Sequence, residues 1–208
     1  MKILSFDTCL DKTYVTLSDE QNCVNRVVLS DSENYHSAYL IPTIVDILKS
    51  NGLTPNDLDY IATDIGPGSF TGIRACTTVA RVLAQQLNIG LIGVSSLEIL
   101  SKILGSNDLV ALDARKNKAY FYDKEIKGAI DIEQVTALLK GKRVVTDDSL
   151  WQRFKDAGLD VVSFQQQDYP LGEILAKIAK EKINMGIDTD WRKLKPLYIQ
   201  PPPVFKKG

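Results

Sequence analysis

The first candidate for chemistry is a glycine-rich segment, Gly66-Pro67-Gly68-Ser69-Phe70-Thr71-Gly72, which lies between a predicted strand and a predicted helix. A strand, a glycine-rich turn and a helix can together bind phosphate, because backbone N–H groups converge at the start of the helix. The glycine spacing is one residue longer than in G-x-G-x-x-G, and Ile73-Arg74 stands where a Walker A loop has lysine and a hydroxyl residue. The spacing therefore favours a tight turn with close helix–sheet packing over a phosphate-binding loop.

The second candidate is Asp7-Thr8, which ends the first apolar run of the chain. At such a strand end an ATPase can place an aspartate that organises Mg²⁺, followed by glycines that let the backbone wrap a phosphate. The segment after Thr8 is Cys9-Leu10-Asp11-Lys12, and the similar segment Asp113-Ala114-Arg115-Lys116 also lacks glycine. We interpret Asp7-Thr8 as a vestigial phosphate turn. This predicts no ATP hydrolysis by the chain itself and leaves weak nucleotide binding open.

Histidine and cysteine offer little for metal or nucleophilic chemistry. His36 is the single histidine, and Leu40 stands where an H-x-x-x-H metal site would have its second imidazole. No G-x-S-x-G segment accompanies His36, so a hydrolase triad is not expected. Cys9, Cys23 and Cys76 form no C-x-x-C pair and are expected to be reduced, small hydrophobic residues. We therefore predict no catalytic residue, no metal site and no cofactor.

Composition and charge limit the class of protein. The chain has 208 residues, 44% hydrophobic and 25% charged, which fits one large domain or two small lobes with a real core. Residues 1–106 carry a net charge of −4 and residues 107–208 a net charge of +3. Neither value has the strong basic excess of a nucleic-acid-binding domain. The sequence shows no signal peptide and no membrane span, so we expect a cytoplasmic protein.

Apolar patterns in the first half predict three strands followed by alternating helices and strands. Strands at 2–8, 13–18 and 23–29 are joined by short polar links and should form an antiparallel meander, with the first strand buried on both faces. The further elements expected here are a helix at 35–50, a short helix from Thr54-Pro55, a strand at 59–65, a helix to about 87, a strand at 89–94, and a helix to Leu104 that Ser95 and Glu98 open as a capping box.

The second half repeats the beginning of this plan in reduced form. We expect strands at 109–113, 118–122, 143–146 and 161–164, helices at 149–157 and 171–185, and an extended tail from Pro196. The duplicated order predicts an α/β protein with the actin-like, sugar-kinase and Hsp70-type (ASKHA) ATPase fold. Its first lobe would span residues 1–106, and a degenerate second lobe with an extended tail residues 107–208.

Two helices of the first lobe are more apolar than contact with one sheet requires. In the helix at 35–50 the apolar positions cover an arc of about 160°. In the helix at 70–87 they cover more than half of the circumference and leave a narrow polar ridge at Arg74, Thr78, Arg81 and Gln85. An apolar excess of this kind commonly marks a protein interface. We predict contacts with a partner through Leu40, Ile41, Ile44, Arg74, Thr78 and Arg81, on outer helix faces rather than in a pocket.

Several segments resemble the TsaB (YeaZ) family in both order and spacing. They are Ile3-Leu4-Ser5-Phe6-Asp7-Thr8-Cys9, similar to "ILAIDTS"; His36-Ser37 with Leu40, Pro42 and Ile44, similar to "HS…LLP.I"; Gly66 to Arg74, nearly "GPGSFTGLR"; Val94-Ser95-Ser96-Leu97-Glu98, matching "VSSLE"; and Asp113-Ala114-Arg115 with Tyr120, matching "DAR…E.Y". The nine-residue glycine-rich match is highly specific. After residue 125 the resemblance is loose.

The resemblance implies an ATPase relative that has lost its own active site. Such a chain would be a non-catalytic scaffold or activator subunit of the complex that installs threonylcarbamoyl on N6 of adenosine 37 in tRNAs reading ANN codons. It would form a heterodimer with the catalytic subunit TsaD through the first-lobe helices, which adds His36 to the expected contact residues. TsaE would be a further partner, tRNA would be contacted indirectly, and the chain alone could form a homodimer.

Two alternatives remain open on the sequence. One is an autonomous ATP-dependent small-molecule kinase of the same fold, which would bind and turn over ATP alone. The other is a metallopeptidase, which would hold stoichiometric metal, although His36 has no second histidine to help it.

Overall fold

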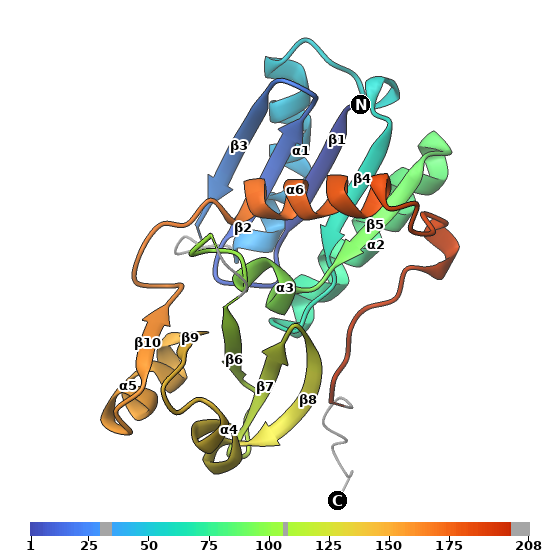
Figure 1. Ribbon diagram of the computed structural model, residues 1–208. Coiled ribbons are helices and arrows are strands. Elements are labelled where there is room, and N and C mark those ends of the chain that lie inside the picture. The colour runs from blue at the N-terminus through green and yellow to red at the C-terminus, as the bar shows by residue number, and fades with distance from the viewer. Residues whose placement is uncertain (30–34, 106–107, 201–208) are drawn as a thin grey trace, which may run out of the picture.

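Two five-stranded sheets form the framework of the protein (Figure 1). The computed structural model describes residues 1–29, 35–105 and 108–200. The first sheet has the order β3-β2-β1-β4-β5. Its strands are β1 (Ile3–Asp7), β2 (Thr13–Ser18), β3 (Cys23–Val28), β4 (Tyr60–Asp64) and β5 (Gly90–Val94). The first three strands pair antiparallel, and β1 is central and wholly buried, which confirms the predicted meander.

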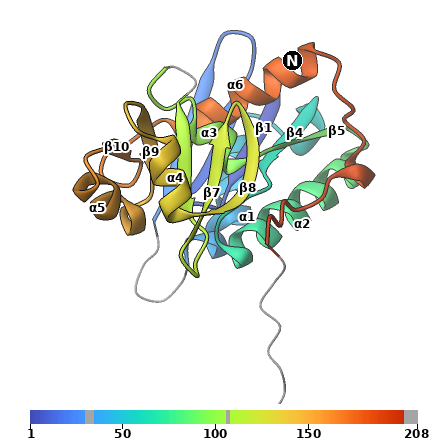
Figure 2. The same cartoon turned by 60° about the horizontal axis from the view of Figure 1, so that its bottom comes forward.

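Helices cover both faces of the first sheet (Figures 1 and 2). On one face lie α1 (Leu40–Ser50) and α2 (Phe70–Leu87), and on the other lies α6 (Leu171–Asn184). The helix predicted at 35–50 begins as a 3-10 turn, η1 (His36–Tyr39). Pro42 has no N–H to donate to the carbonyl four residues earlier, so regular α-helical bonding cannot extend back through this turn. A further 3-10 turn, η2 (Pro55–Asp57), leads into β4.

The last part of the chain returns to the first lobe. α6 packs against β1, β2 and β5, although the sequence analysis assigns it to the second lobe. The segment after α6 contains η3 (Trp191–Lys193) and follows the edge of the first sheet. There the N–H of Leu91 donates to the Thr189 carbonyl at 2.9 Å, and the N–H of Leu197 donates to the Ile65 carbonyl at 2.8 Å. An amphipathic pattern predicts that a helix covers an apolar surface, but it does not specify which one.

The second sheet repeats the strand order of the first. Its order is β10-β9-β6-β7-β8, with strands β6 (Leu109–Asp113), β7 (Lys118–Asp123), β8 (Glu125–Asp131), β9 (Arg143–Thr146) and β10 (Asp160–Ser163). Read from β8, this is the first-sheet pattern of third, second, first, fourth and fifth strand. The duplicated order confirms the predicted actin-like, sugar-kinase and Hsp70-type fold.

The structure corrects the predicted content of the second lobe. Neither β8 nor α4 (Ile132–Leu138) is among the elements predicted from the sequence. The segment of β8 is mostly charged or exposed, contains a glycine and shows no clear apolar alternation. The sheet of this lobe is therefore complete. The reduction lies in its helices, since α4 has 7 residues and α5 (Asp148–Asp156) has 9, against 11 in α1 and 18 in α2.

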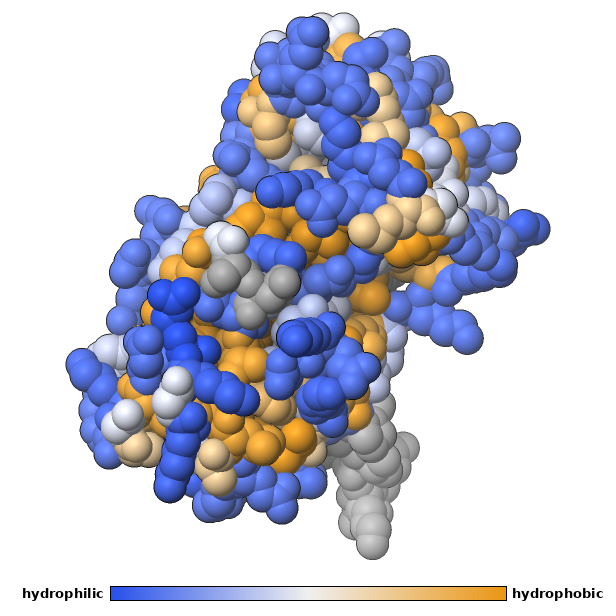
Figure 3. Space-filling model, viewed as in Figure 1, coloured by the Kyte–Doolittle hydropathy of each residue, from blue (hydrophilic) through white to orange (hydrophobic). Residues whose placement is uncertain are grey.

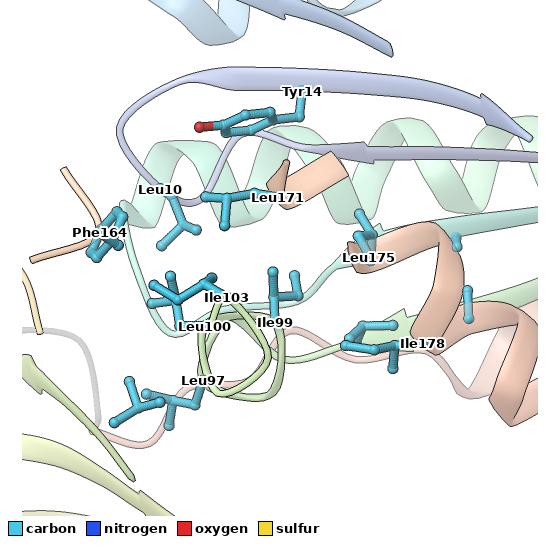
Figure 4. Close-up of a cluster of buried hydrophobic side chains, with 14 of the residues drawn as sticks. Leu10, Tyr14, Leu97, Ile99, Leu100, Ile103, Phe164, Leu171, Leu175 and Ile178 are labelled. Atoms are coloured by element: carbon cyan, nitrogen blue, oxygen red, sulfur yellow. The ribbon is translucent and has the colours of Figure 1, made fainter. Parts of the chain in front are cut away.

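A shared apolar core joins the two lobes. α3 (Ser96–Leu100) lies between the sheets, and its side chains pack with those of α6, Leu10 and Phe164 (Figure 4). Val110 and Val145 of the second sheet belong to the same cluster. Figure 3 shows apolar side chains in the waist between the lobes, below the polar surface of α6. None of the described helices is long and apolar enough to cross a membrane.

The start of α3 departs from the predicted capping box in one detail. The Ser95 hydroxyl accepts the N–H of Glu98 at 3.2 Å, which confirms the predicted N-cap. The Glu98 carboxylate binds Lys182 of α6 at 2.7 Å, so it links α3 to α6 instead of completing the box.

Candidate partner-binding groove

α1 has an apolar surface that extends beyond its contact with the sheet. Its buried residues are Leu40, Ile44, Ile47 and Leu48. Ile41 and Val45 lie outside this core and are 58% and 57% exposed. The wide apolar arc predicted from the sequence is therefore divided between the core of the first lobe and an exposed strip of the helix.

α2 shows the same division. Its sheet-facing side buries small and medium side chains, including Cys76, Ala80 and Ala84. Val82 is 51% exposed. The predicted polar ridge of Arg74, Thr78, Arg81 and Gln85 is confirmed, since all four residues are exposed.

An apolar groove of about 530 Å³ lies between these two helices. The groove is lined from α1 by Ile41, Ile44, Val45 and Leu48, and from α2 by Val79, Val82 and Leu83. Leu53 and Pro55 add apolar surface from the segment after α1, and the polar residues of its lining are Lys49, Thr54 and Thr78. No carboxylate, histidine or cysteine is among these lining residues, so the groove is unsuited to acid–base or nucleophilic chemistry. It is suited to the apolar side chains of another protein.

The predicted contact residues do not all lie on this surface. Ile41 is exposed and lines the groove, and Ile44 is 5% exposed and also lines it. Thr78 also lines the groove, and Arg81 is exposed on the same helix. Leu40 is 1% exposed within the core, which corrects its predicted place on the contact surface. Leu40 lies four residues before Ile44 on the sheet-facing side of the helix. Helical periodicity places both residues on one side, but it cannot tell a core position from a groove position.

Arg74 and His36 are the two further predicted contact residues, and Arg74 is not among the described residues that line the groove. Arg74 sits over the ring of Phe70 with its guanidinium carbon 5.4 Å from the ring centre. Phe70 packs against Tyr198 at a ring-centre distance of 5.6 Å, so this part of α2 borders the C-terminal segment. The side chain of His36 lies outside the part of the chain that the structure describes. Val45 and Val82 are groove residues that were not among the predicted contacts, although both belong to the apolar arcs of the two helices.

The glycine-rich segment packs α2 against the turn after β1. A Cβ atom on Gly68 would come within 2.3 Å of the Cys9 carbonyl oxygen, and one on Gly72 within 1.8 Å of the Thr8 carbonyl oxygen. The N–H of Ser69 donates to the Cys9 carbonyl at 2.7 Å, and the Ser69 hydroxyl accepts the N–H of Gly72 at 3.2 Å. The Cys9 carbonyl and the Ser69 hydroxyl therefore already accept hydrogen bonds from the backbone N–H groups that a bound phosphate would need. This confirms the predicted tight turn with close helix–sheet packing.

Asp7 and Thr8 are both buried beside this contact. The Thr8 hydroxyl donates to the Gly72 carbonyl at 2.8 Å, and Asp7 Oδ1 accepts the N–H of Cys9 at 2.5 Å. Burial, together with the nearby Asp64 and Cys76, raises the pKa of Asp7 well above its ordinary value. Burial also raises the pKa of Asp64 to about 6, although Gly66 N–H and the Ser96 hydroxyl donate to its carboxylate. The expected phosphate turn is thus a buried polar cluster beneath the start of α2.

A polar cleft of about 360 Å³ lies between the lobes. Asp11, Asp113 and Asp147 line it together with Arg115. Burial raises the pKa values of Asp11 and Asp147, which is the effect of removing carboxylates from water. Three carboxylates against one guanidinium disfavour a bare phosphate group in this cleft. The sequence analysis identified the segments of Asp11 and Asp113 but not Asp147, which is the N-cap of α5.

The sequence is similar to a family model and to several relatives. A family model described as "TsaD: tRNA N6-adenosine threonylcarbamoyltransferase" matches residues 23–183. The chain is 28% identical to the tRNA threonylcarbamoyladenosine biosynthesis protein TsaB of Escherichia coli over 228 aligned positions, covering 100% of this chain and 98% of that protein. It is 30% identical to the protein of the same name from Buchnera aphidicola subsp. Acyrthosiphon pisum, covering 70% of this chain and 67% of the relative.

Solved structures agree on the fold. The structure called "YeaZ from Pseudomonas aeruginosa" superposes with a TM-score of 0.77 at 22% identity, covering 95% of this chain and 99% of that chain. Sequence, glycine-rich signature and duplicated fold therefore agree, and the chain belongs to the TsaB family.

Proposed function

We propose that this chain is a non-catalytic partner subunit in the biosynthesis of threonylcarbamoyladenosine in tRNA, and that it acts by forming a heterodimer with a TsaD-type catalytic subunit. The observation that carries the proposal is the apolar groove between α1 and α2, whose lining includes the exposed Ile41, Val45 and Val82. The names of the curated TsaB relatives supply the pathway. A face of this kind is costly to leave in water and is stabilised by a partner that covers it.

The non-catalytic part of the proposal has separate support. The turn after β1 contains no glycine, and Asp7 is 2% exposed beneath α2. The glycines of the signature segment contact Thr8 and Cys9 and so serve packing. Threonylcarbamoyl transfer to N6 of adenosine 37 would then be the work of the TsaD-type partner. TsaE would join that complex, and this cytoplasmic chain would reach tRNA through it.

Co-purification with the TsaD-type protein of the same organism tests the heterodimer. We expect wild-type protein to form a complex and Ile41→Asp or Val82→Asp to weaken it by at least about 10-fold, because the contact would desolvate an unpaired carboxylate. These positions are better probes than Ile44, whose buried side chain also supports the fold. Leu138→Asp is the matched control, since Leu138 is 51% exposed on α4 of the other lobe. Equal binding by all variants would contradict the proposed surface.

ATP turnover by the purified chain separates this proposal from its alternative, an autonomous small-molecule kinase. We expect no turnover above a no-protein control with the chain alone. ATP turnover that co-elutes with the folded protein in each purification step would favour the kinase.

A further inference from the structure

The fold brings together two cysteines and one aspartate that are distant in the sequence. Cys9 follows β1 and Cys76 lies in α2, yet their sulfur atoms and a carboxylate oxygen of Asp7 all lie within 4.8 Å of one another. All three residues are buried, with exposed fractions of 2% for Asp7, 1% for Cys9 and 0% for Cys76. Three potential metal ligands therefore converge on one point under the start of α2.

The Asp7 carboxyl in this cluster has no cationic partner among the described residues. Its Oδ2 atom is buried and accepts no N–H or hydroxyl group from them, and the side chains of Asp7 and Asp64 hydrogen-bond to each other, which requires a proton on one of them. The neighbouring Asp64 is also 0% exposed, and neither carboxylate forms an ion pair with a described lysine, arginine or histidine. Burial of an unpaired carboxylate is unfavourable, so this position calls for a positive charge from a proton or from a metal ion.

The sulfur atoms make a metal ion the better match. The backbone N–H of Thr8 donates to Cys76 Sγ at 3.0 Å, and the Thr8 hydroxyl lies 3.0 Å from the same sulfur. The Thr8 hydroxyl already donates its proton to the Gly72 carbonyl, so the Cys76 thiol donates to the Thr8 hydroxyl oxygen. Two sulfur ligands and a carboxylate are a donor set for zinc, whereas Mg²⁺ and Ca²⁺ prefer oxygen ligands alone.

We propose that Asp7, Cys9 and Cys76 form a zinc-binding site that ties the start of α2 to the turn after β1. In a tetrahedral zinc site with bonds of roughly 2.0–2.3 Å, neighbouring ligand atoms lie roughly 3.3–3.8 Å apart. The 4.8 Å limit of the observed cluster exceeds this spacing by about 1.0–1.5 Å, which the ligands would have to close on binding. Cys9 is also among the residues that line the cleft between the lobes, so the cluster lies next to space that solvent can reach.

Binding changes the protonation of the cluster. Burial raises the pKa of Cys9, so this thiol is protonated without metal. Zinc would bind the two sulfur atoms as thiolates and Asp7 as a carboxylate, and protons held by these groups would pass to solvent. The cysteine spacing in the sequence predicts no such site, because 66 residues separate Cys9 from Cys76 and only the packing of α2 on β1 joins them.

Cobalt(II) titration of the full-length, reduced protein tests the site. Co²⁺ replaces zinc in tetrahedral sites, and thiolate ligands give it an intense near-ultraviolet charge-transfer band. We expect stoichiometric Co²⁺ binding with this band, and displacement of Co²⁺ by added Zn²⁺. Absence of the band in folded wild-type protein would overturn the proposal and leave a shared proton as the charge that stabilises Asp7.

Three variants identify the ligands. Cys23→Ser is the matched control, because Cys23 is exposed and lies outside the cluster, and it should behave as wild type. Cys9→Ser with Cys76→Ser should abolish the band, and Asp7→Asn should weaken Co²⁺ binding by more than the roughly 10- to 100-fold that outer-shell changes cost. A band that survives in the double variant, or that is lost in Cys23→Ser, would overturn the assignment. Circular dichroism checks that each variant is folded, and if the double variant is not, the comparison of Asp7→Asn with Cys23→Ser decides.

Discussion

Gly72 lies directly against the carbonyl oxygen of Thr8. A Cβ atom at position 72 would be 1.8 Å from that oxygen, which is far inside any allowed contact. The Thr8 hydroxyl also donates to the Gly72 carbonyl at 2.8 Å, so backbone and side chain both fix the start of α2 on the end of β1. The family signature thus has a structural explanation at this residue: it permits two backbones to touch.

Gly72→Ala tests this contact. The added methyl group meets backbone that cannot rotate away, so we expect a loss of stability of about 1–3 kcal/mol or more. Thr71→Ala is the control, since Thr71 is exposed on the same turn of α2, and it should change stability by less than about 0.5 kcal/mol. Urea unfolding followed by circular dichroism measures both. Equal stability of Gly72→Ala and wild type would show that the contact is looser than the structure has it.

The exposed face of α1 and α2 should also promote self-association when no partner is present. We expect the average mass of the isolated chain to rise with concentration in sedimentation experiments, because a second copy can cover the groove. Val45→Asp should keep the chain monomeric. Met185→Asp changes a residue that is 76% exposed away from the groove, and it should leave association unchanged. Concentration-independent monomers in the wild type would restrict the groove to a heterologous partner.

The core between the lobes predicts that they unfold together. Leu97 is fully buried in the cluster formed by α3, α6 and both sheets. Leu97→Ala should cost about 2–5 kcal/mol, and the two lobes should still unfold in a single transition. Leu138→Ala, at an exposed position, should have little effect. Two separate transitions in calorimetry would mean that the shared core does not couple the lobes.

Asp147 is the N-cap of α5, and its carboxylate should affect the stability of the protein. Its carboxylate accepts the N–H of Leu150 at 3.1 Å as the N-cap of α5, and the N–H of Asp113 at 2.6 Å. Asp147→Ala should cost about 1–2 kcal/mol, whereas Asp147→Asn keeps a capping oxygen and should cost less. Guanidinium unfolding at neutral pH measures the difference between the two variants.

The raised pKa of Asp147 predicts how the stability difference between Asp147→Asn and wild type changes with pH. Burial raises the pKa above its usual value near 4, so ionisation in the folded state costs stability. That cost is absent below the unfolded pKa and grows as pH rises from about 4 through the folded value. The stability of Asp147→Asn relative to wild type should therefore improve between pH 4 and pH 7. A constant difference across this range would argue that the hydrogen bonds to Asp147 offset its burial.

Much of the first lobe could be predicted from local patterns. The strand Ile3–Asp7 is mostly apolar and shows little alternation, and Asn51-Gly52 ends helix α1, so periodicity and turn residues were sufficient to predict these elements. β8 was missed because its charged, half-exposed residues carry no apolar period. Leu40 and Ile41 show the same limit at the candidate surface: they are neighbours in one apolar arc, yet one is buried and the other exposed.

By itself the sequence determined the family signature, the duplicated order of elements, the lack of glycine in both phosphate turns and the apolar excess of two helices. These are local properties, set by residue type and spacing. Tertiary structure alone decided that α6 covers the first sheet, that an apolar groove forms between α1 and α2, and that Cys76 meets Asp7 and Cys9. The physical reason is that each of these features depends on which surfaces pack together. Packing brings together residues that are far apart in the sequence, and their spacing in the sequence does not predict the contact.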